Sequence, residues 1–308
     1  MNGDPAIPNP ALLFEPVADG YGPRLALVFG NEARGGVCPF YGPQCYHCDI
    51  GAGEGVRFDT AMNRRRLAFF QQHYASVLPH LAHLVLYNSG SVLNPREFAP
   101  PSLDAILEYA GRLRACRVVS LDAREGYITS AHLERVLRHL RPDQRPRPIL
   151  GLETQDDRVR LRILRKKMTR QAVETCFRAV GAQAGRVGLD VNIVFGLPPL
   201  QGRAAIAEAE ATALYCLALA ERHGVPLDFN LHPYYPSRVG REHFPDHPRA
   251  DLSAGLEAAH RIRQAIARSG WPALLFIGWQ DEAHDQDQPA RRAELAGYAA
   301  LFHRFNVT

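Results

Sequence analysis

Lysine is almost absent from this chain of 308 residues, where Lys166 and Lys167 are the only two and arginine supplies the other basic side chains. Two adjacent exceptions to so strong a bias are consistent with a site that needs an ammonium group, and equally with chance. Long apolar runs are also missing, so we predict no membrane span. The first residues have neither the basic nor the apolar region of a secretory signal. We therefore expect a cytoplasmic protein.

Other classes are excluded by missing motifs. No Gly-x-Gly-x-x-Gly or Walker sequence follows any apolar run, which argues against dinucleotide or P-loop chemistry. The net charge of +4 is too small to require a nucleic-acid partner by itself. What the chain does have is 46% hydrophobic and 22% charged residues, which is enough apolar material for one large globular core.

Short apolar runs alternate with helical patterns along most of the sequence. This alternation predicts parallel βαβ units and an α/β fold, with a partial or complete parallel β/α barrel favoured over a flat sheet. We place helix caps at Ser102 and Ser130. Three regions follow from the pattern: an arm over 1–20, a barrel core over 21–240 and an extension over 241–308. The expected strands are 24–29, 84–87, 118–121, 149–152, 191–195, 229–231 and 274–277. The expected helices are 60–78, 102–113, 130–140, 157–165, 169–182, 204–223, 253–269 and 291–304.

Polar side chains gather where the predicted strands end. The carboxyl edge of a parallel sheet or barrel is where active sites lie, so these residues together predict one functional edge, although each alone is also explained as a cap or turn. They are Asn88, Ser89, Asp122, Glu153, Asn192, Asn230 and His232.

A loop rich in glycine and proline follows the first predicted strand and carries Cys38, Cys45 and Cys48. Soft thiolates select zinc or iron–sulfur centres, and three of them leave one ligand position open. His47 would complete a zinc set, but it is adjacent to Cys48 and would rarely share one tetrahedral ion with it. The spacing favours an iron–sulfur cluster without excluding zinc. The remaining cysteines lie within or at the ends of predicted covering helices, and we expect them to be small buried residues: Cys116, Cys176 and Cys216.

The cysteine loop resembles that of the radical SAM superfamily, in which three cysteines hold a [4Fe–4S] cluster and S-adenosylmethionine binds the fourth iron. The usual Cys-x3-Cys-x2-Cys spacing is Cys-x6-Cys-x2-Cys here, a departure that elongator-type members also show. Further segments resemble the enzymes of that superfamily that form archaeosine in tRNA. These segments are 87–97, 151–157, 164–169 and 192–198.

The resemblance implies roles for particular positions. The three loop cysteines would hold the cluster, Lys166 would bind the carboxylate of S-adenosylmethionine, and Glu153 would accept from its ribose. Ser89 and Gly90 would meet its amino group, and 196–198 would line the adenine. The full set expected to bind the cofactor is Asn88, Ser89, Gly90, Glu153, Lys166, Asn192, Gly196 and Pro198. No residue is identified as the catalytic one.

The expected function is that of a radical SAM enzyme that takes a hydrogen atom from a small biosynthetic intermediate. Such an enzyme would need a reducing partner such as ferredoxin or flavodoxin, and it would need no membrane. A tRNA-base modifier of the archaeosine type is the alternative, weakened by acidic residues at Asp281, Glu282 and 285–287. A non-catalytic zinc-binding protein is the second alternative.

Overall fold

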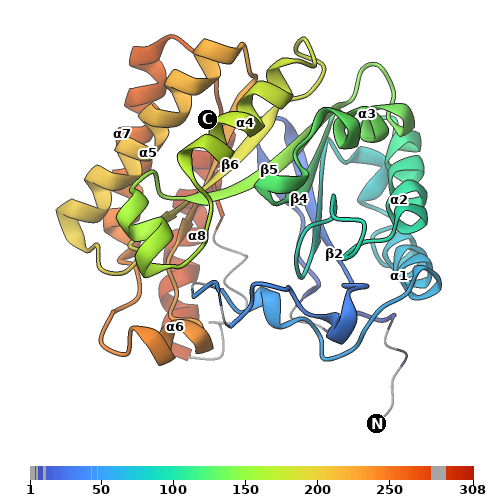
Figure 1. Ribbon diagram of the computed structural model, residues 1–308, viewed down its shortest axis with the longest axis horizontal. Helices are drawn as coiled ribbons and strands as arrows, with labels where there is room; N and C mark the ends of the chain where they lie inside the picture. Colours follow the sequence, from blue (N-terminus) through green and yellow to red (C-terminus); the bar gives the residue numbers. More distant parts are fainter. Residues whose placement is uncertain (1–3, 5, 10–11, 43, 47, 279–288) are drawn as a thin grey trace. The chain divides into compact units, whose positions relative to one another are not determined.

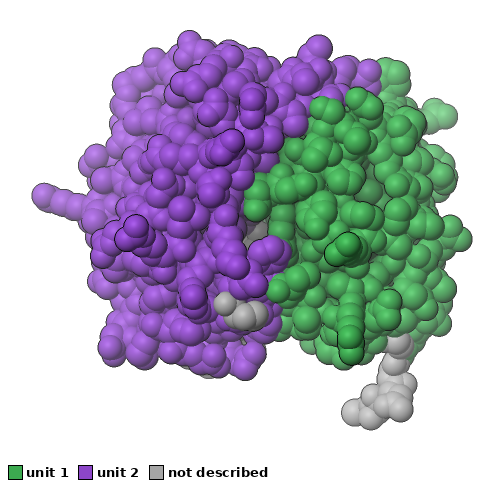
Figure 2. Space-filling model, in the orientation of Figure 1, with its two compact units in different colours: residues 1–39, 50–149 green, residues 40–49, 150–308 purple. Residues whose placement is uncertain are grey.

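The computed structural model describes residues 4, 6–9, 12–42, 44–46, 48–278 and 289–308. His47 and the acidic residues Asp281, Glu282, Asp285 and Asp287 therefore lie outside the described residues. The chain divides into two compact units, coloured separately in Figure 2. Unit 1 comprises Met1–Pro39 and Ile50–Ile149, and unit 2 comprises Phe40–Asp49 and Leu150–Thr308. The cysteine loop thus contributes to both units.

The strands follow one another in sheet order from β1 to β8. The first pair, β1 with β2, is antiparallel, and the registers described for later pairs are parallel. Sequential parallel strands joined by helices give the topology of β/α barrels, so the predicted α/β fold class is confirmed. The strands are β1 (Val17–Asp19), β2 (Gly22–Phe29), β3 (His83–Asn88), β4 (Val118–Ala123), β5 (Arg145–Glu153), β6 (Leu189–Phe195), β7 (Leu227–Pro233) and β8 (Leu275–Ile277).

In unit 1, helices α1 (Thr60–His73), α2 (Pro100–Arg112) and α3 (Ser130–His139) form one layer beside the strands (Figure 1). Each helix turns an apolar face inward, as Leu133 and Val136 of α3 illustrate. β3 and β4 are buried along most of their length because helices cover them.

The two predicted helix caps are wrong. Ala99 precedes α2, because consecutive prolines start that helix two residues before Ser102. Ser102 is instead buried within the helix, where its hydroxyl contacts Glu32. Thr129 rather than Ser130 caps α3, because it is the residue with extended backbone and its oxygen accepts from the amide of His132.

β1 lies within the predicted N-terminal arm and places a buried charged cluster at the start of the sheet. Oδ2 of Asp19 is 2.6 Å from Nδ1 of His83, whose Nε2 is 2.8 Å from Oγ of Ser120 on β4. All three side chains are buried. Nε of Arg24 approaches the same carboxylate at 3.8 Å.

In unit 2, α5 and α7 lie side by side over the strands (Figure 1), and α8 is tied to β8 by two hydrogen bonds between Asn306 and Ile277. The segment expected to be helical over 157–165 is a short π-helix, η6 (Arg158–Ile163). The short helix α6 was not predicted. The helices of this unit are α4 (Arg170–Gly181), α5 (Gly202–His223), α6 (Arg238–His243), α7 (Leu252–Ser269) and α8 (Pro289–Val307). In the described part of the chain, no helix is both long and apolar enough to cross a membrane.

Candidate cluster and cofactor site

The unit 1 part of the cysteine loop leaves β2 through a 3-10 turn at Arg34–Gly36 and leads to Cys38. The amide of Cys38 donates to the carbonyl of Gly51 at 2.8 Å. Gly36 has a φ of +67°, and a Cβ there would lie 2.2 Å from the carbonyl oxygen of Val56. Only glycine therefore fits this close backbone approach. The Cys38 thiol is half-buried and in no disulfide.

A guanidinium faces the Cys38 sulfur. Nη2 of Arg124, which directly follows β4, lies 2.7 Å from Sγ of Cys38. The same nitrogen is 3.7 Å from the buried carboxylate of Glu97. The amide of Arg124 donates to Oγ of Ser91 at 3.2 Å, which fixes its backbone. A cation therefore lies in direct contact with the sulfur of Cys38. Sequence reasoning missed Arg124, although its position just after a predicted strand was a usable signal.

The predicted residue Asn88 ends β3, and the turn that follows carries Ser89 and Gly90 and lies against the cysteine loop within unit 1. Oγ of Ser89 is 3.5 Å from the carbonyl oxygen of Gly36. A Cβ on Gly90 would lie 1.9 Å from a carboxylate oxygen of Glu97, so this position also excludes a side chain. Asn88 is fully buried, and its Oδ1 has no hydrogen-bond partner among the described residues. The structure thus brings these three residues near the loop that precedes the first cysteine.

In unit 2, Cys45 and Cys48 lie on either side of Tyr46 in the chain, and both are half-buried and in no disulfide. The ring of Tyr46 stacks on His243 of α6, with centroids 3.6 Å apart, and its hydroxyl accepts from Nη1 of Arg165 at 2.6 Å. Its amide donates to the carbonyl of residue 164 at 3.2 Å. These contacts fix the two cysteines relative to the turn after η6.

That turn carries Lys166, whose ammonium donates to the carboxylate of Glu153 at the end of β5. The two side chains are 17% and 4% exposed, so this ion pair is largely withdrawn from water. Burial by itself would lower the pKa of Lys166. The negative charges of Glu153, then Cys45, then Cys48 outweigh it, so the pKa lies above its usual value. Lys166 therefore keeps its positive charge near both thiols, as its predicted role requires.

The remaining predicted residues of unit 2 lie on β6 and the turn after it. Oδ1 of Asn192 accepts from Nδ2 of Asn230 at 3.1 Å. Gly196 has a φ of +78°, and its carbonyl oxygen is 2.8 Å from Nε2 of His247. Pro198 is buried in the same turn. The cofactor contacts assigned to these residues stay predictions.

The donor atoms suit an iron–sulfur cluster. None of the three thiols is in a disulfide, all are partly accessible, and in unit 1 a guanidinium contacts the Cys38 sulfur. Among the residues that the structure describes, no group of three or more Cys, His, Asp or Glu side chains is close enough together to hold a metal ion.

No protein-family model matches the chain, and no curated protein matches it. Several solved structures are similar to it. SuiB of Streptococcus suis bound to S-adenosylmethionine is 10% identical, with a TM-score of 0.55 over 88% of this chain and 54% of that one. SuiB bound to its precursor peptide SuiA is 10% identical, with a TM-score of 0.54 over 85% and 51%. A queuine lyase from Clostridium spiroforme bound to SAM and queuine is 13% identical, with a TM-score of 0.49 over 73% and 83%.

The chain spans about half the length of the SuiB chains that it matches. At this level of identity the similarity establishes the fold. The expected α/β fold is therefore confirmed as one that the chain shares with the matched part of SuiB.

Proposed function

We propose that this protein is a radical SAM enzyme that cleaves S-adenosylmethionine reductively and takes a hydrogen atom from a small-molecule substrate. One observation carries the proposal: the loop after β2 presents three thiols that are in no disulfide, with a half-buried cation on each side of the loop, in a fold shared with SAM-bound SuiB. The cations are Arg124 in unit 1 and Lys166 in unit 2. A disulfide-bonded or purely structural loop would have no need of them.

Cys38, Cys45 and Cys48 would hold the cluster, and Arg124 would offset part of the negative charge of the thiolates. When bound, the [4Fe–4S] cluster would supply the electron that breaks a carbon–sulfur bond of S-adenosylmethionine and yields a 5′-deoxyadenosyl radical. A reducing partner such as ferredoxin or flavodoxin would in turn supply that electron. The cytosol, where thiols stay reduced, suits such a set of free cysteines.

The polar residues would bind and orient S-adenosylmethionine. Lys166 would hold the carboxylate of its methionine part, because an ammonium donates strong charge-assisted hydrogen bonds. Glu153, released from Lys166 by that carboxylate, would accept from the ribose hydroxyls. Ser89 and the backbone at Gly90 would receive the amino group. Asn88, Asn192 and the turn over 196–198 would complete the contacts to the nucleoside.

The first test is the metal content. Prepared without oxygen, the protein should contain about four iron and four sulfide per chain. Replacing Cys38, Cys45 or Cys48 by Ala should abolish this content, whereas Cys116→Ala, Cys176→Ala and Cys216→Ala should leave it unchanged, because these side chains are fully buried. Zinc bound under strictly anaerobic reconstitution would instead support the alternative of a zinc-binding protein.

The second test is the chemistry. With dithionite and S-adenosylmethionine, the wild-type protein should release 5′-deoxyadenosine slowly even without its substrate. An intact cluster that yields no such product with several reductants would refute the proposed activity.

A tRNA substrate is the second candidate, and one observation favours it. Arg158, Arg162 and Lys167 are exposed around the Lys166 turn, and none of them makes an ion pair with another described residue. Phosphate binding by these cations would fall steeply with salt. Titration of tRNA at two salt concentrations, with and without replacement of these side chains, would distinguish RNA from a small-molecule substrate.

A further inference from the structure

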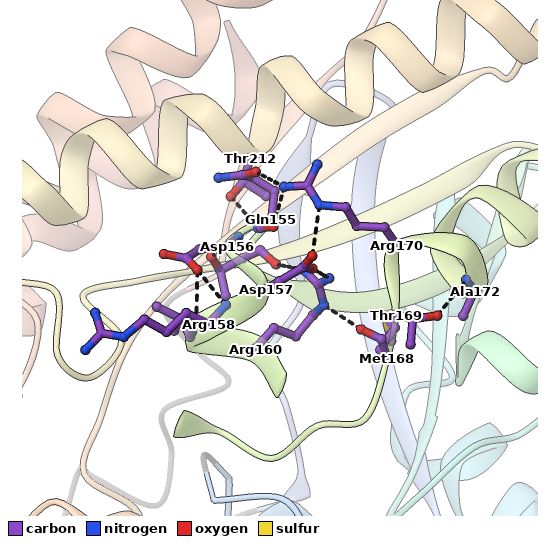
Figure 3. A network of polar contacts seen from close by, with 12 residues as sticks. Gln155, Asp156, Asp157, Arg158, Arg160, Met168, Thr169, Arg170, Ala172 and Thr212 are labelled. Atoms are coloured by element: carbon purple, nitrogen blue, oxygen red, sulfur yellow. Dashed lines mark hydrogen bonds and ion pairs between the residues drawn. The ribbon is translucent and has the colours of Figure 1, made fainter. Parts of the chain in front are cut away.

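Arg160 is among the largest side chains that the protein buries completely, and it lies in η6, between Glu153 and Lys166 in the chain. Its Nη1 donates to the carbonyl of Thr154, and its Nε donates to the carbonyl of Met168, both at 2.7 Å. Its Nη2 pairs with Asp157, and Figure 3 shows Arg160 reaching toward Met168. Thr154 follows Glu153, and Met168 lies two residues after Lys166. A single guanidinium therefore joins both ends of the segment 154–168.

The backbone of Arg160 is part of the same arrangement. Its amide donates to the carbonyl of Asp156 at 2.8 Å, and its carbonyl accepts from the amide of Lys166 at 2.9 Å. Three residues of this region have left-handed backbone that non-glycine residues adopt only at a cost: Glu153 at φ +67°, Arg165 at +56° and Lys167 at +61°. Such conformations persist where surrounding contacts impose them. The buried guanidinium supplies the contacts at both ends.

A second tether reaches the segment from α5. The carboxylate of Glu208 accepts from Oγ of Thr154 at 2.5 Å, from Nε2 of Gln155 at 3.1 Å and from the amide of Asp156 at 3.1 Å. The chain just after Glu153 is thus held by Arg160 on one side and by Glu208 on the other.

We propose that Arg160 is the positioning residue that holds Glu153 and Lys166 together in the arrangement that receives S-adenosylmethionine. The ligand assigned here rests on the proposed function; the positioning itself does not. Arg160 acts through backbone carbonyls and touches neither charged group of the pair. Its Nε and Nη1 donate to Met168 and Thr154 from one rigid plane, whereas the donors of a lysine ammonium rotate on a flexible stem and would hold the two carbonyls less firmly.

The two lysines of the chain provide an internal probe. Lys166 is paired and largely buried, whereas the neighbouring Lys167 is exposed. Brief acylation of the whole protein with acetic anhydride, followed by peptide mass mapping, measures the acylation rates of both lysine amines in one sample. In the wild type Lys166 should react about tenfold more slowly than Lys167, because it is free only when its charge-assisted hydrogen bond opens.

In Arg160→Lys the acylation rates of Lys166 and Lys167 should become similar. Arg158→Lys is the matched control on the same π-helix, because the Arg158 side chain is exposed and points away from Arg160 in Figure 3, and only its backbone amide joins the network, by donating to Asp156. In Arg158→Lys the tenfold difference between the acylation rates of Lys166 and Lys167 should remain. Equal rates in the wild type, or an unchanged difference in Arg160→Lys, would overturn the inference. If Arg160→Lys does not fold, Glu208→Gln loosens the second tether and should reduce the difference; no reduction in that variant would overturn the inference too.

The same samples separate this inference from the proposed function. Arg160→Lys should bind S-adenosylmethionine about tenfold more weakly in anaerobic titrations, with its iron content retained and Arg158→Lys unaffected. A wild type that shows the tenfold difference but binds no S-adenosylmethionine would refute the proposed function and leave the positioning intact. A wild type that binds it, with an Arg160→Lys variant of equal affinity, would refute the positioning role.

Discussion

The ion pair between Lys166 and Glu153 gives the sharpest prediction, because stability and ligand binding depend on it in different ways. Lys166→Met keeps most of the apolar stem and removes the ammonium. The carboxylate of Glu153, only 4% exposed, then loses its positive partner. Glu153→Gln removes the buried negative charge, and the double variant removes both charges together.

The expected magnitudes follow from this burial. Removing one partner of a buried ion pair costs about 3–5 kcal/mol, because the other charge is left uncompensated. The double variant should recover most of that loss, since neither charge remains. Affinity for S-adenosylmethionine should behave differently. A charge-assisted hydrogen bond of about 1.5–3 kcal/mol corresponds to a change in the dissociation constant of roughly ten- to a hundredfold. Lys166→Met and the double variant both lack this bond, so both should bind S-adenosylmethionine more weakly by that factor.

Chemical denaturation would measure the unfolding free energy of the three variants, and anaerobic isothermal titration would measure the affinity. Lys167→Met is the control, because that side chain is exposed and should change the unfolding free energy by less than about 0.5 kcal/mol. The pKa of Lys166 is raised, so the pair should contribute fully at neutral pH and weaken only as the pH rises through the raised value.

Two results would refute the reasoning. If the double variant regains wild-type affinity, the pair is structural and Lys166 does not bind the carboxylate. If Lys167→Met weakens binding while Lys166→Met does not, the ammonium that binds the cofactor belongs to the neighbouring residue.

Three further variants test other parts of the structure. Arg124→Gln removes the guanidinium beside the Cys38 sulfur and should lower the midpoint potential of the cluster by about 40 mV, because a lost contact of about 1 kcal/mol corresponds to that shift for one electron. A redox titration followed by EPR would measure the potential. An unchanged potential would show that the contact is absent when the cluster is bound. Burial by itself would raise the pKa of Asp19, but hydrogen bonding and charge from His83 outweigh it and lower the pKa, so its contribution should be present above about pH 4 and lost as the pH falls through the lowered value. Thermal unfolding from pH 7 to pH 3 should therefore show a steeper loss in the wild type than in Asp19→Asn, and equal slopes would contradict this. Gly90→Ala places a Cβ 1.9 Å from a buried carboxylate oxygen and should cost about 1–3 kcal/mol in denaturant unfolding, so a variant as stable as the wild type would show that the turn relaxes freely.

Local sequence patterns were enough to predict the order of strands β2 to β8 and of the helices other than α6, but they missed β1. The apolar runs and the capped helical stripes appear close to their expected positions because each element is encoded by neighbouring residues. Errors occurred at boundaries, as at Ser102, where two prolines start the helix earlier than the serine suggested. The short helix α6 was missed because its six residues carry too little periodicity to be recognised.

The sequence by itself determined which groups are available: three thiols in one loop, two lysines, and polar residues at the strand ends. Only the tertiary structure decided how they are held. It placed Arg124 against Cys38, 86 residues away in the chain, and it buried Arg160 with its fork between two carbonyls. The strength of such contacts depends on distance and on exclusion of water, and both arise when distant segments pack together. Composition and spacing contain neither quantity, so they specify the chemistry of the site without the contacts that position it.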